Sequence, residues 1–303
     1  MTARFDEPIS ATTGLADWGE CRFLSCSVLP VRVACNLTCP FCFSKSSLSA
    51  LRDEPRRWDL GEVANYYRFA RDRGAMRLVV TGGGEPLLRP GLVVDLVRTG
   101  RRVFDEVALF TNGSRLTPDL VRHLADAGLS YVCYSRHAAD DDENRALMGA
   151  GAPAVTEVAA AAAAGPLKLR ATCVMTRGYV DDKAAVWRYI DTLRPFGISE
   201  FTFKHTYVAY ERSVFQGTNE DTWSRRHQVE FDPFEGEGEP VGGLPWGPVI
   251  RRKGELQICY YREPTPEWER RHQLCRSSNL LSNGSVYASL EDQSSLLYRL
   301  GNS

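Results

Sequence analysis

The chain has 303 residues, enough for one large hydrophobic core or for a main domain with a small one. Its formal net charge of −1 disfavours a nucleic-acid-binding or membrane-surface protein, because these partners select strongly basic surfaces. No apolar run is long enough to span a bilayer, and residues 1–10 lack the basic start and apolar stretch of a signal peptide.

Nine cysteines without an export signal are typical of a reducing compartment, so we expect a cytoplasmic protein whose thiols bind metal rather than form disulfides. Two of them, Cys21 and Cys26, lie in an N-terminal segment, residues 1–27, ahead of the first predicted strand. The four residues between them could form a loop around a metal.

A cysteine loop, residues 35–42, follows the first predicted strand, residues 28–34. Cys35, Cys39 and Cys42 stand in it as C-N-L-T-C-P-F-C. Iron–sulfur clusters usually take four cysteines, so a tight trio leaves one iron of a four-iron cluster for a ligand that is not protein. A zinc knuckle is the alternative, but its usual C-x2-C pairs fit this spacing poorly.

A glycine loop, residues 82–86, follows the second predicted strand, residues 77–81. It reads Gly82, Gly83, Gly84, Glu85, Pro86. Glycine permits close approach of the backbone to another group. A phosphate loop or a plain turn is the alternative, but the Lys-Ser/Thr of a P-loop is missing.

The two loops, in this order and at this interval, resemble the signature of the radical S-adenosylmethionine (radical SAM) superfamily. The resemblance implies a four-iron, four-sulfur (4Fe-4S) cluster on Cys35, Cys39 and Cys42, with S-adenosylmethionine on the open iron. It also implies cofactor contacts from the aromatic Phe41 and from the glycine loop at Gly83, Gly84, Glu85 and Pro86.

The middle of the chain alternates β-rich runs with helix-forming stretches, the βαβ rhythm of a parallel sheet. The predicted strands are residues 28–34, 77–81, 106–111, 131–135, 167–176 and 200–208, and the predicted helices are 61–73, 91–99, 117–127, 154–164 and 182–193. This pattern resembles the partial (β/α)6 TIM-type barrel of the superfamily over residues 28–210. The predicted fold class is α/β, with a small C-terminal α+β extension.

Barrels of parallel strands carry their chemistry at the carboxyl ends of the strands. Asn112, after the third strand, resembles the superfamily's third-strand end, and Ser135 falls where the superfamily often contacts the ribose or carboxylate of the cofactor. Arg170 could pair with that carboxylate, because a guanidinium suits bidentate contacts. We therefore predict these three residues as cofactor contacts, although Asn112-Gly113 could be only a turn.

The composition changes after residue 208, where Pro, Gly and Glu become frequent. We predict a C-terminal domain, residues 211–303, with hairpins at residues 251–258 and 280–287. With Cys275 ahead of the second hairpin, it resembles the twitch extension of the superfamily, which binds an auxiliary iron–sulfur cluster. Ser289 stands where a cysteine often follows such a hairpin, which disfavours a four-cysteine site built from this region alone.

Cys133 and Cys173 lie in apolar strand patterns and are predicted core residues. Four cysteines are then unassigned: Cys21, Cys26, Cys259 and Cys275. All four could bind an auxiliary 4Fe-4S cluster, or some could be ordinary buried thiols. We favour a cluster on Cys21, Cys26 and Cys275, with Cys259 projecting from its strand toward the barrel mouth.

In the superfamily, reductive cleavage of the cofactor yields a 5′-deoxyadenosyl radical that abstracts a hydrogen atom from the substrate. A thiol on the opposite face could return a hydrogen atom and invert the carbon, whereas an auxiliary cluster that accepts an electron would give oxidation. Cys259 is thus the predicted catalytic residue. The resemblance also implies an external electron donor such as flavodoxin or ferredoxin.

Two acidic runs suggest a polycationic small-molecule substrate, because carboxylates attract ammonium groups. They are residues 140–143 and the stretch that contains Glu230, Asp232, Glu235, Glu237 and Glu239. A solvated surface is the alternative. Nearby aromatic side chains such as Trp223 and Trp246 could stack on sugar rings or cations.

Chain length, extension, spare cysteine and acidic runs together resemble the aminoglycoside-modifying branch of the superfamily. We predict an epimerase that inverts a sugar C–H centre of an aminoglycoside antibiotic. The alternatives are a dehydrogenase or decarboxylase of a sugar or aminocyclitol, a ribosomal-peptide maturase, and a non-catalytic iron–sulfur sensor. A maturase usually carries a peptide-recognition domain ahead of the barrel, for which residues 1–24 are too short.

Overall fold

The computed structural model describes residues 14–50, 56–211 and 213–301. A large curved sheet runs through these residues, with strands in the order β14-β13-β12-β2-β3-β4-β5-β6-β7-β10-β9-β8. Parallel pairing links the strands from β12 to β10. These strands are Cys26–Val28 (β2), Arg77–Val80 (β3), Glu106–Thr111 (β4), Tyr131–Ser135 (β5), Lys168–Val174 (β6), Glu200–Lys204 (β7), Leu256–Tyr261 (β10) and Ser278–Leu280 (β12).

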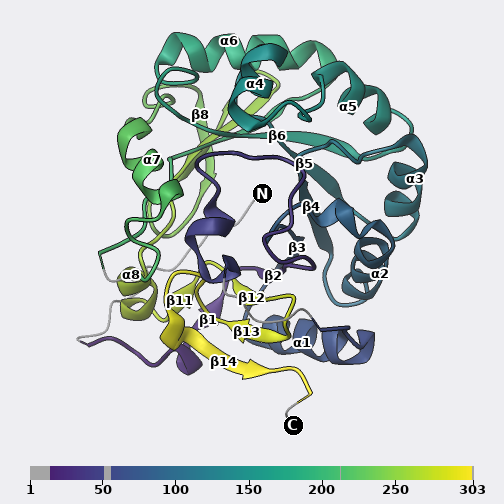
Figure 1. Cartoon of the computed structure of the whole chain (residues 1–303), viewed down its shortest axis with the longest axis vertical. Helices are drawn as coiled ribbons and strands as arrows, with labels where there is room; N and C mark the ends of the chain where they lie inside the picture. Colours follow the sequence, from purple (N-terminus) through teal and green to yellow (C-terminus); the bar gives the residue numbers. More distant parts are fainter. Residues whose placement is uncertain (1–13, 51–55, 212, 302–303) are drawn as a thin grey trace.

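Helices cover the outer face of the curved sheet (Figure 1). They are Leu60–Asp72 (α1), Pro90–Gly100 (α2), Pro118–Asp126 (α3), Asp141–Met148 (α4), Val155–Ala162 (α5) and Lys183–Leu193 (α6). Two later helices lie elsewhere: Asn219–His227 (α7) contacts the short helical turn Phe43–Ser46, and Pro266–Arg271 (α8) contacts β11. Thr117 caps α3 by accepting a hydrogen bond from the Leu120 amide, and Pro118 occupies the first turn, where no N–H is needed. The predicted α/β class with a parallel sheet is confirmed.

Alternation along each strand separates the core from an inner cavity. In β5, Val132 and Tyr134 pack into the main hydrophobic core, whereas Tyr131 and Cys133 line the cavity. In β6, the predicted core residue Cys173 is fully buried in the same hydrophobic core. The strands therefore bury one face under helices and present the other to a cavity.

The first predicted strand is misplaced. It was expected at residues 28–34, but β2 spans Cys26–Val28, and the chain then leaves the sheet. The reason is Pro30, which has no N–H to continue a ladder. The early end of β2 lets the following residues cross over the barrel and deliver the cysteine loop.

The acidic run at residues 140–143 begins a helix that was not predicted. The Asp140 carboxylate accepts hydrogen bonds from the Asp142 and Glu143 amides and caps α4. Acidic residues in a first helical turn are favoured by the helix dipole. This run is therefore a helix start, not an acidic loop.

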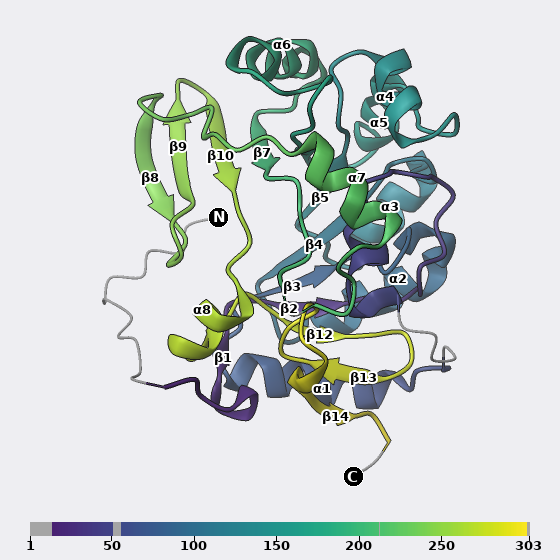
Figure 2. The same ribbon diagram turned by 60° about the vertical axis from the view of Figure 1, so that its left-hand side comes forward.

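The C-terminal residues add strands to both edges of the sheet. Glu239–Gly243 (β8) and Val249–Lys253 (β9) join through β10 to β7, and Ser285–Tyr287 (β13) and Leu296–Arg299 (β14) join through β12 to β2 (Figure 2). Both predicted hairpins are present. A short separate sheet pairs Arg22–Phe23 (β1) with Leu274–Cys275 (β11). The division of the chain at residues 27 and 210 stays a prediction.

Within the described ranges, every helix is too short or too polar to cross a bilayer.

Candidate functional site

The cysteine loop connects β2 to α1 and lies over the carboxyl ends of the strands. Cys35 is exposed and Cys39 and Cys42 are half-buried, whereas the other cysteines are buried. Desolvation, together with the neighbouring Cys42 and Cys35 thiols, raises the pKa of Cys39 to about 12. The three thiols are therefore close enough to influence one another, and a positive centre would be needed to stabilise their thiolates.

These thiols do not form a site for a single ion. Among the described residues, no three His, Cys, Asp or Glu side chains are grouped so that they could hold one metal ion. In a cubane cluster each cysteine binds a different iron, so the sulfurs are spaced more widely than around one ion. Three accessible neighbouring thiols on one loop fit such a cluster.

Asn112 connects the end of β4 to the cysteine loop. Its Nδ2 donates to Asn36 Oδ1 at 3.1 Å and lies 3.8 Å from Cys35 Sγ. Its Oδ1 accepts from the Ser114 amide at 3.0 Å. Asn112 thus holds the cysteine loop in place, whereas its predicted contact with the cofactor stays a prediction.

The glycine loop packs against the backbone that leads into the cysteine loop. Gly83 has φ +98°, and a Cβ on Gly83 or Gly84 would overlap the carbonyl oxygen of Val31 or Ala34, respectively. The Glu85 amide donates to Ala34 O at 2.9 Å. The close approach that glycine permits is therefore made to the protein itself, a contact that the sequence analysis did not predict.

Glu85 is a buried brace between the glycine loop and β4. Its carboxylate accepts hydrogen bonds from the Leu87 amide at 3.0 Å, from Thr111 Oγ1 at 2.7 Å and from the Asn112 amide at 2.9 Å. Burial raises the pKa of Glu85, while these donors oppose the rise. The carboxylate and the amide of Glu85 are both occupied within the protein, and its contact with the cofactor stays a prediction. Pro86 is buried in the short helical turn that follows.

Aromatic side chains surround Phe41. Its ring packs edge-on against His137, with centroids 4.8 Å apart, and lies 5.8 Å from the Trp223 ring. His137 Nδ1 accepts from the Val174 amide at 2.9 Å, and burial, with nearby Lys204 and Arg136, lowers the pKa of His137 to about 3. A neutral His137 therefore supports Phe41.

Two predicted cofactor contacts at the strand ends have different surroundings. Ser135 is half-buried at the carboxyl end of β5, where its contact with the cofactor stays a prediction. Arg170 lies nearer the amino end of β6, where its Nε is 2.7 Å from Glu200 Oε2 and its guanidinium stacks 3.5 Å from the centre of the Tyr131 ring. The charge of Arg170 is therefore paired within the protein, and its contact with the cofactor stays a prediction.

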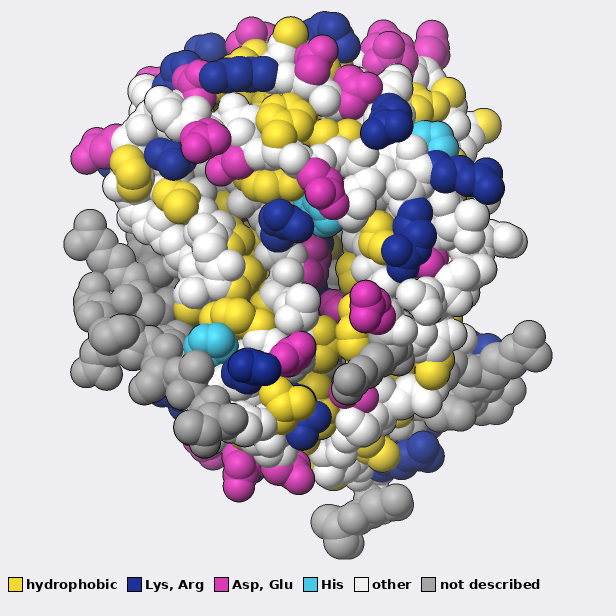
Figure 3. Space-filling model, turned by 90° about the vertical axis from the view of Figure 1, so that its left-hand side faces the viewer, with side chains coloured by type: hydrophobic (Ala, Val, Ile, Leu, Met, Phe, Trp, Pro, Cys, Tyr) yellow, Lys and Arg dark blue, Asp and Glu magenta, His cyan; other side chains and the backbone are white. Residues whose placement is uncertain are grey.

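A cavity of about 560 Å³ occupies the inside of the barrel, within the usual range for ligand pockets. Figure 3 shows a hollow near the centre of one face, with acidic side chains in its depth and hydrophobic side chains on its walls. Of the residues that the structure describes, four cationic ones line the cavity together with three carboxylates: Arg77, Arg170, Lys204, Arg276, Glu106, Glu200 and Glu263.

Neither acidic run contributes to this lining among the described residues. Glu237, for example, lies 2.6 Å from both Lys183 and Lys253, so its charge is neutralised by ion pairs elsewhere. The acidic runs therefore give no support to a polycationic substrate in this cavity.

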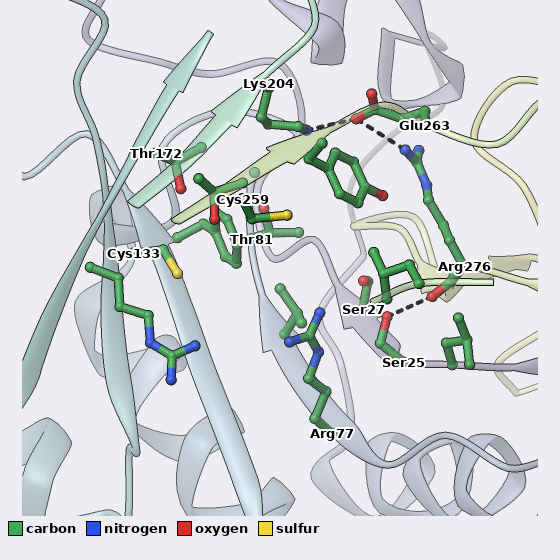
Figure 4. Close-up of a pocket in the computed structure, with 18 of the residues that line it drawn as sticks. Ser25, Ser27, Arg77, Thr81, Cys133, Thr172, Lys204, Cys259, Glu263 and Arg276 are labelled. Carbon is green, nitrogen blue, oxygen red and sulfur yellow. Dashed lines mark hydrogen bonds and ion pairs between the residues drawn. The ribbon is translucent and has the colours of Figure 1, made fainter. Parts of the chain in front are cut away.

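Cys259 lies on the cavity wall (Figure 4). It is buried in β10, paired in register with Thr202 of β7. Burial raises the pKa of the Cys259 thiol to about 12, so the sulfur keeps its hydrogen. Cys133, the other thiol that lines the cavity among the described residues, projects from β5.

The predicted auxiliary ligands are not all together. The Cys21 and Cys275 thiols are hydrogen-bonded to each other, and this contact is the largest cause of a lowered pKa for Cys21. Cys26, in contrast, lies against Tyr66 and Ser278, and burial raises its pKa to about 12. The structure therefore brings two of the three predicted ligands together.

Comparison with known proteins gives a family match. The model of the Radical SAM superfamily matches residues 29–185. PqqA peptide cyclase from Streptomyces rochei is 34% identical over 148 residues, which cover 48% of this chain and 39% of that protein. GTP 3′,8-cyclase from Heliobacterium modesticaldum is 31% identical over 192 residues, 59% of this chain and 58% of that protein. Mycofactocin maturase MftC from Mycobacterium ulcerans is 34% identical over 181 residues, 56% and 46% of the respective chains.

The matched regions thus cover 39% to 58% of the length of these three curated relatives. Among solved structures, Streptococcus suis SuiB bound to S-adenosylmethionine has a TM-score of 0.59 at 16% identity, covering 89% of this chain and 60% of that chain. Native anSMEcpe with bound AdoMet has a TM-score of 0.56 at 16% identity, covering 92% and 78%. At such identity these structures share the fold alone.

Proposed function

The chain belongs to the radical SAM superfamily, and we propose that it is an epimerase that inverts a sugar C–H centre of an aminoglycoside antibiotic, similar to neomycin C epimerase. The superfamily binds a 4Fe-4S cluster and S-adenosylmethionine, so the predicted cofactors follow from membership. The reaction and the substrate are the proposal.

Cys35, Cys39 and Cys42 would hold the cluster. Phe41 directly precedes Cys42, and the glycine loop packs on the backbone that leads into the cysteine loop. When bound and reduced, the cluster and S-adenosylmethionine supply a 5′-deoxyadenosyl radical that takes a hydrogen atom from the substrate. The protein's own part is to position these groups over the cavity and to exclude competing reactions.

The observation that carries the proposal is the protonated Cys259 thiol on the cavity wall. After a substrate carbon has lost a hydrogen atom, homolysis of the Cys259 S–H bond returns one and leaves a sulfur radical. One electron and one proton then restore the thiol, the electron coming from an external donor of the flavodoxin or ferredoxin class. Return on the opposite face inverts the carbon.

Two further parts of the proposal are an auxiliary cluster and a cytoplasmic location. Cys21, Cys26 and Cys275 are the proposed ligands of the auxiliary cluster, and its formation would require Cys26 to turn from Tyr66 toward the other two. The location follows from the reducing environment that nine cysteines and iron–sulfur chemistry favour.

A second candidate is a ribosomal-peptide maturase. It is favoured by the names of two relatives, a PqqA peptide cyclase and a mycofactocin maturase. A dehydrogenase or decarboxylase of a sugar is the third candidate. These candidates differ in what happens after hydrogen abstraction, so product analysis separates them.

The test compares Cys259→Ala with Cys133→Ala, which removes the other cavity thiol. We expect Cys259→Ala to keep its iron and, with a neomycin-class aminoglycoside present, to form 5′-deoxyadenosine without inverted product. Cys133→Ala should still form inverted product. Thiol hydrogens exchange with water, so the wild-type enzyme in deuterium oxide should place one deuterium at the inverted carbon.

Three outcomes would contradict the proposal. A product lighter by two hydrogens would indicate a dehydrogenase. Iron loss in Cys259→Ala would indicate that Cys259 is a cluster ligand. Turnover of a peptide but of no aminoglycoside would favour the maturase.

A further inference from the structure

A charged triad of Lys204, Glu263 and Arg276 faces the cavity (Figure 4). Lys204 ends β7 and Glu263 follows β10, the strand of Cys259, whereas Arg276 reaches Glu263 from the segment before β12. Lys204 Nζ is 2.6 Å from Glu263 Oε1, and Arg276 Nη1 is 3.3 Å from the same oxygen. Burial opposes ionisation of Glu263, but Lys204 and Arg276 hold the pKa of its carboxyl below the usual value. Lys204 and Arg276 therefore flank the Glu263 carboxylate, Arg276 Nη2 also lies 3.7 Å from Glu291 Oε1, and the three triad residues line the cavity.

Strand register places this triad near Cys259. Lys204 pairs with Tyr261, and Thr202, two residues earlier, pairs with Cys259. Alternate residues of a strand share a face. The Cα of Lys204 therefore lies roughly 7 Å along the strands and about 5 Å across from the Cα of Cys259. A sugar ring could bridge this distance with its hydroxyl at the triad and a C–H bond at the thiol.

The donors and acceptors of the triad match a hydroxyl group. Lysine only donates hydrogen bonds and a carboxylate only accepts them, whereas a hydroxyl does both. The Lys204 side chain keeps 30% of its surface exposed, and its ammonium has three N–H donors, of which Glu263 can take one. A substrate ammonium group at the triad would be repelled by Lys204 and Arg276, and a substrate carboxylate would be repelled by Glu263.

We propose that Lys204 and Glu263 bind a hydroxyl group of the substrate and thereby fix the sugar ring against Cys259, with Arg276 holding Glu263 in place. This inference rests on the proposed function, because it assigns the orientation of the sugar in the same site. The described lining residues include no excess of carboxylates, so the amino groups of an aminoglycoside contribute little to binding here.

Glu237 provides a matched control. It is also a carboxylate held by two cations, Lys183 and Lys253, each at 2.6 Å, but it does not line the cavity. Equivalent substitutions at Glu237 and Lys253 remove a carboxylate or a lysine from an ion-paired cluster that lies away from the cavity.

The experiment measures ligand binding by calorimetry, on anaerobically reconstituted holoenzyme with S-adenosylmethionine and without reductant. The probes are a neomycin-class aminoglycoside and a neutral analogue in which hydroxyls replace all amines. We expect Lys204→Met and Glu263→Gln each to weaken binding of both probes at least about tenfold, a typical cost of losing a hydrogen bond to a charged group. Lys253→Met and Glu237→Gln should change it less than about twofold.

Iron content and circular dichroism show whether each variant is folded. If Glu263→Gln loses iron or secondary structure, the binding result for Lys204→Met decides. If both probes bind the wild type and the cavity variants equally, the inference is overturned while the proposed substrate stands. If only the neutral analogue binds and the cavity variants weaken it, the subsite stands and the aminoglycoside substrate falls. Failure of both probes to bind the wild type overturns both.

Discussion

The cofactor end of the barrel and the wall formed by β7 and β10 are built in different ways. At the cofactor end, backbone contacts set the geometry, as when the glycine loop packs on the carbonyl oxygens of Val31 and Ala34. On the wall, individual side chains such as Cys259 and Glu263 face an open cavity. Substitutions at the first region should therefore disturb folding and cofactor binding together, whereas substitutions at the second should alter only substrate chemistry.

The largest effect should come from removing the cluster ligands. Replacing Cys35, Cys39 and Cys42 together by Ala should abolish dithionite-dependent formation of 5′-deoxyadenosine, because no thiolate then holds the cluster. Chromatographic detection of 5′-deoxyadenosine measures this. Cys173→Ala, in the core, should keep the activity. Continued cofactor cleavage by the triple variant would refute the assignment of the ligands.

The same triple variant tests the auxiliary cluster. Iron that remains bound would belong to a second site, as proposed for Cys21, Cys26 and Cys275. Iron content near zero would contradict that site, and it would agree with the contacts of Cys26, which are with Tyr66 and Ser278.

A smaller but still large effect is expected at Gly84. The Cβ of Gly84→Ala would overlap the Ala34 carbonyl oxygen, so the backbone beside Cys35 must shift. Overpacking of this kind costs about 1–3 kcal/mol and occasionally more. We expect a lower free energy of unfolding in denaturant titration together with lower iron content.

Gly91 is the matched control for Gly84. A Cβ on Gly91 would have nothing within 4 Å, so Gly91→Ala should change the free energy of unfolding by less than about 1 kcal/mol. Equal behaviour of the two variants would mean that the glycine loop does not position the cysteine loop.

The smallest effect concerns pH and His137. An unfolded histidine takes up a proton near pH 6.5, whereas burial lowers the pKa of folded His137 to about 3. Between these values the unfolded chain binds one more proton, so the free energy of unfolding decreases as the pH falls through this window, by at most about 1.4 kcal/mol per pH unit.

His137→Asn keeps an acceptor for the Val174 amide and removes this titration. Its free energy of unfolding should decrease less than that of the wild type between pH 6.5 and 5.5, measured by anaerobic denaturant titration. His123→Asn on the exposed surface of α3 should follow the wild type. Parallel curves for all three proteins would contradict a neutral His137 in the folded state.

Much of the fold could be predicted because its signals are local. The bounds of β4 and β5 match the predicted strands residue for residue, since apolar β-branched and aromatic runs are bounded by turn residues. The predicted first strand is too long at its carboxyl end, because the chain leaves the sheet before Pro30. The sequence pattern missed α4, because its capping Asp140 was interpreted as part of an acidic loop.

The candidate site likewise has a part that the sequence predicts and a part that it does not predict. The sequence by itself determined the superfamily, because the cysteine and glycine loops each carry their chemistry in a few consecutive residues. Only the tertiary structure decided that Arg170 pairs with Glu200, that Cys26 turns toward Tyr66, and that Lys204 and Arg276 meet at Glu263. Such partners are far apart in the chain, and strand register with long-range packing decides which charges and thiols meet.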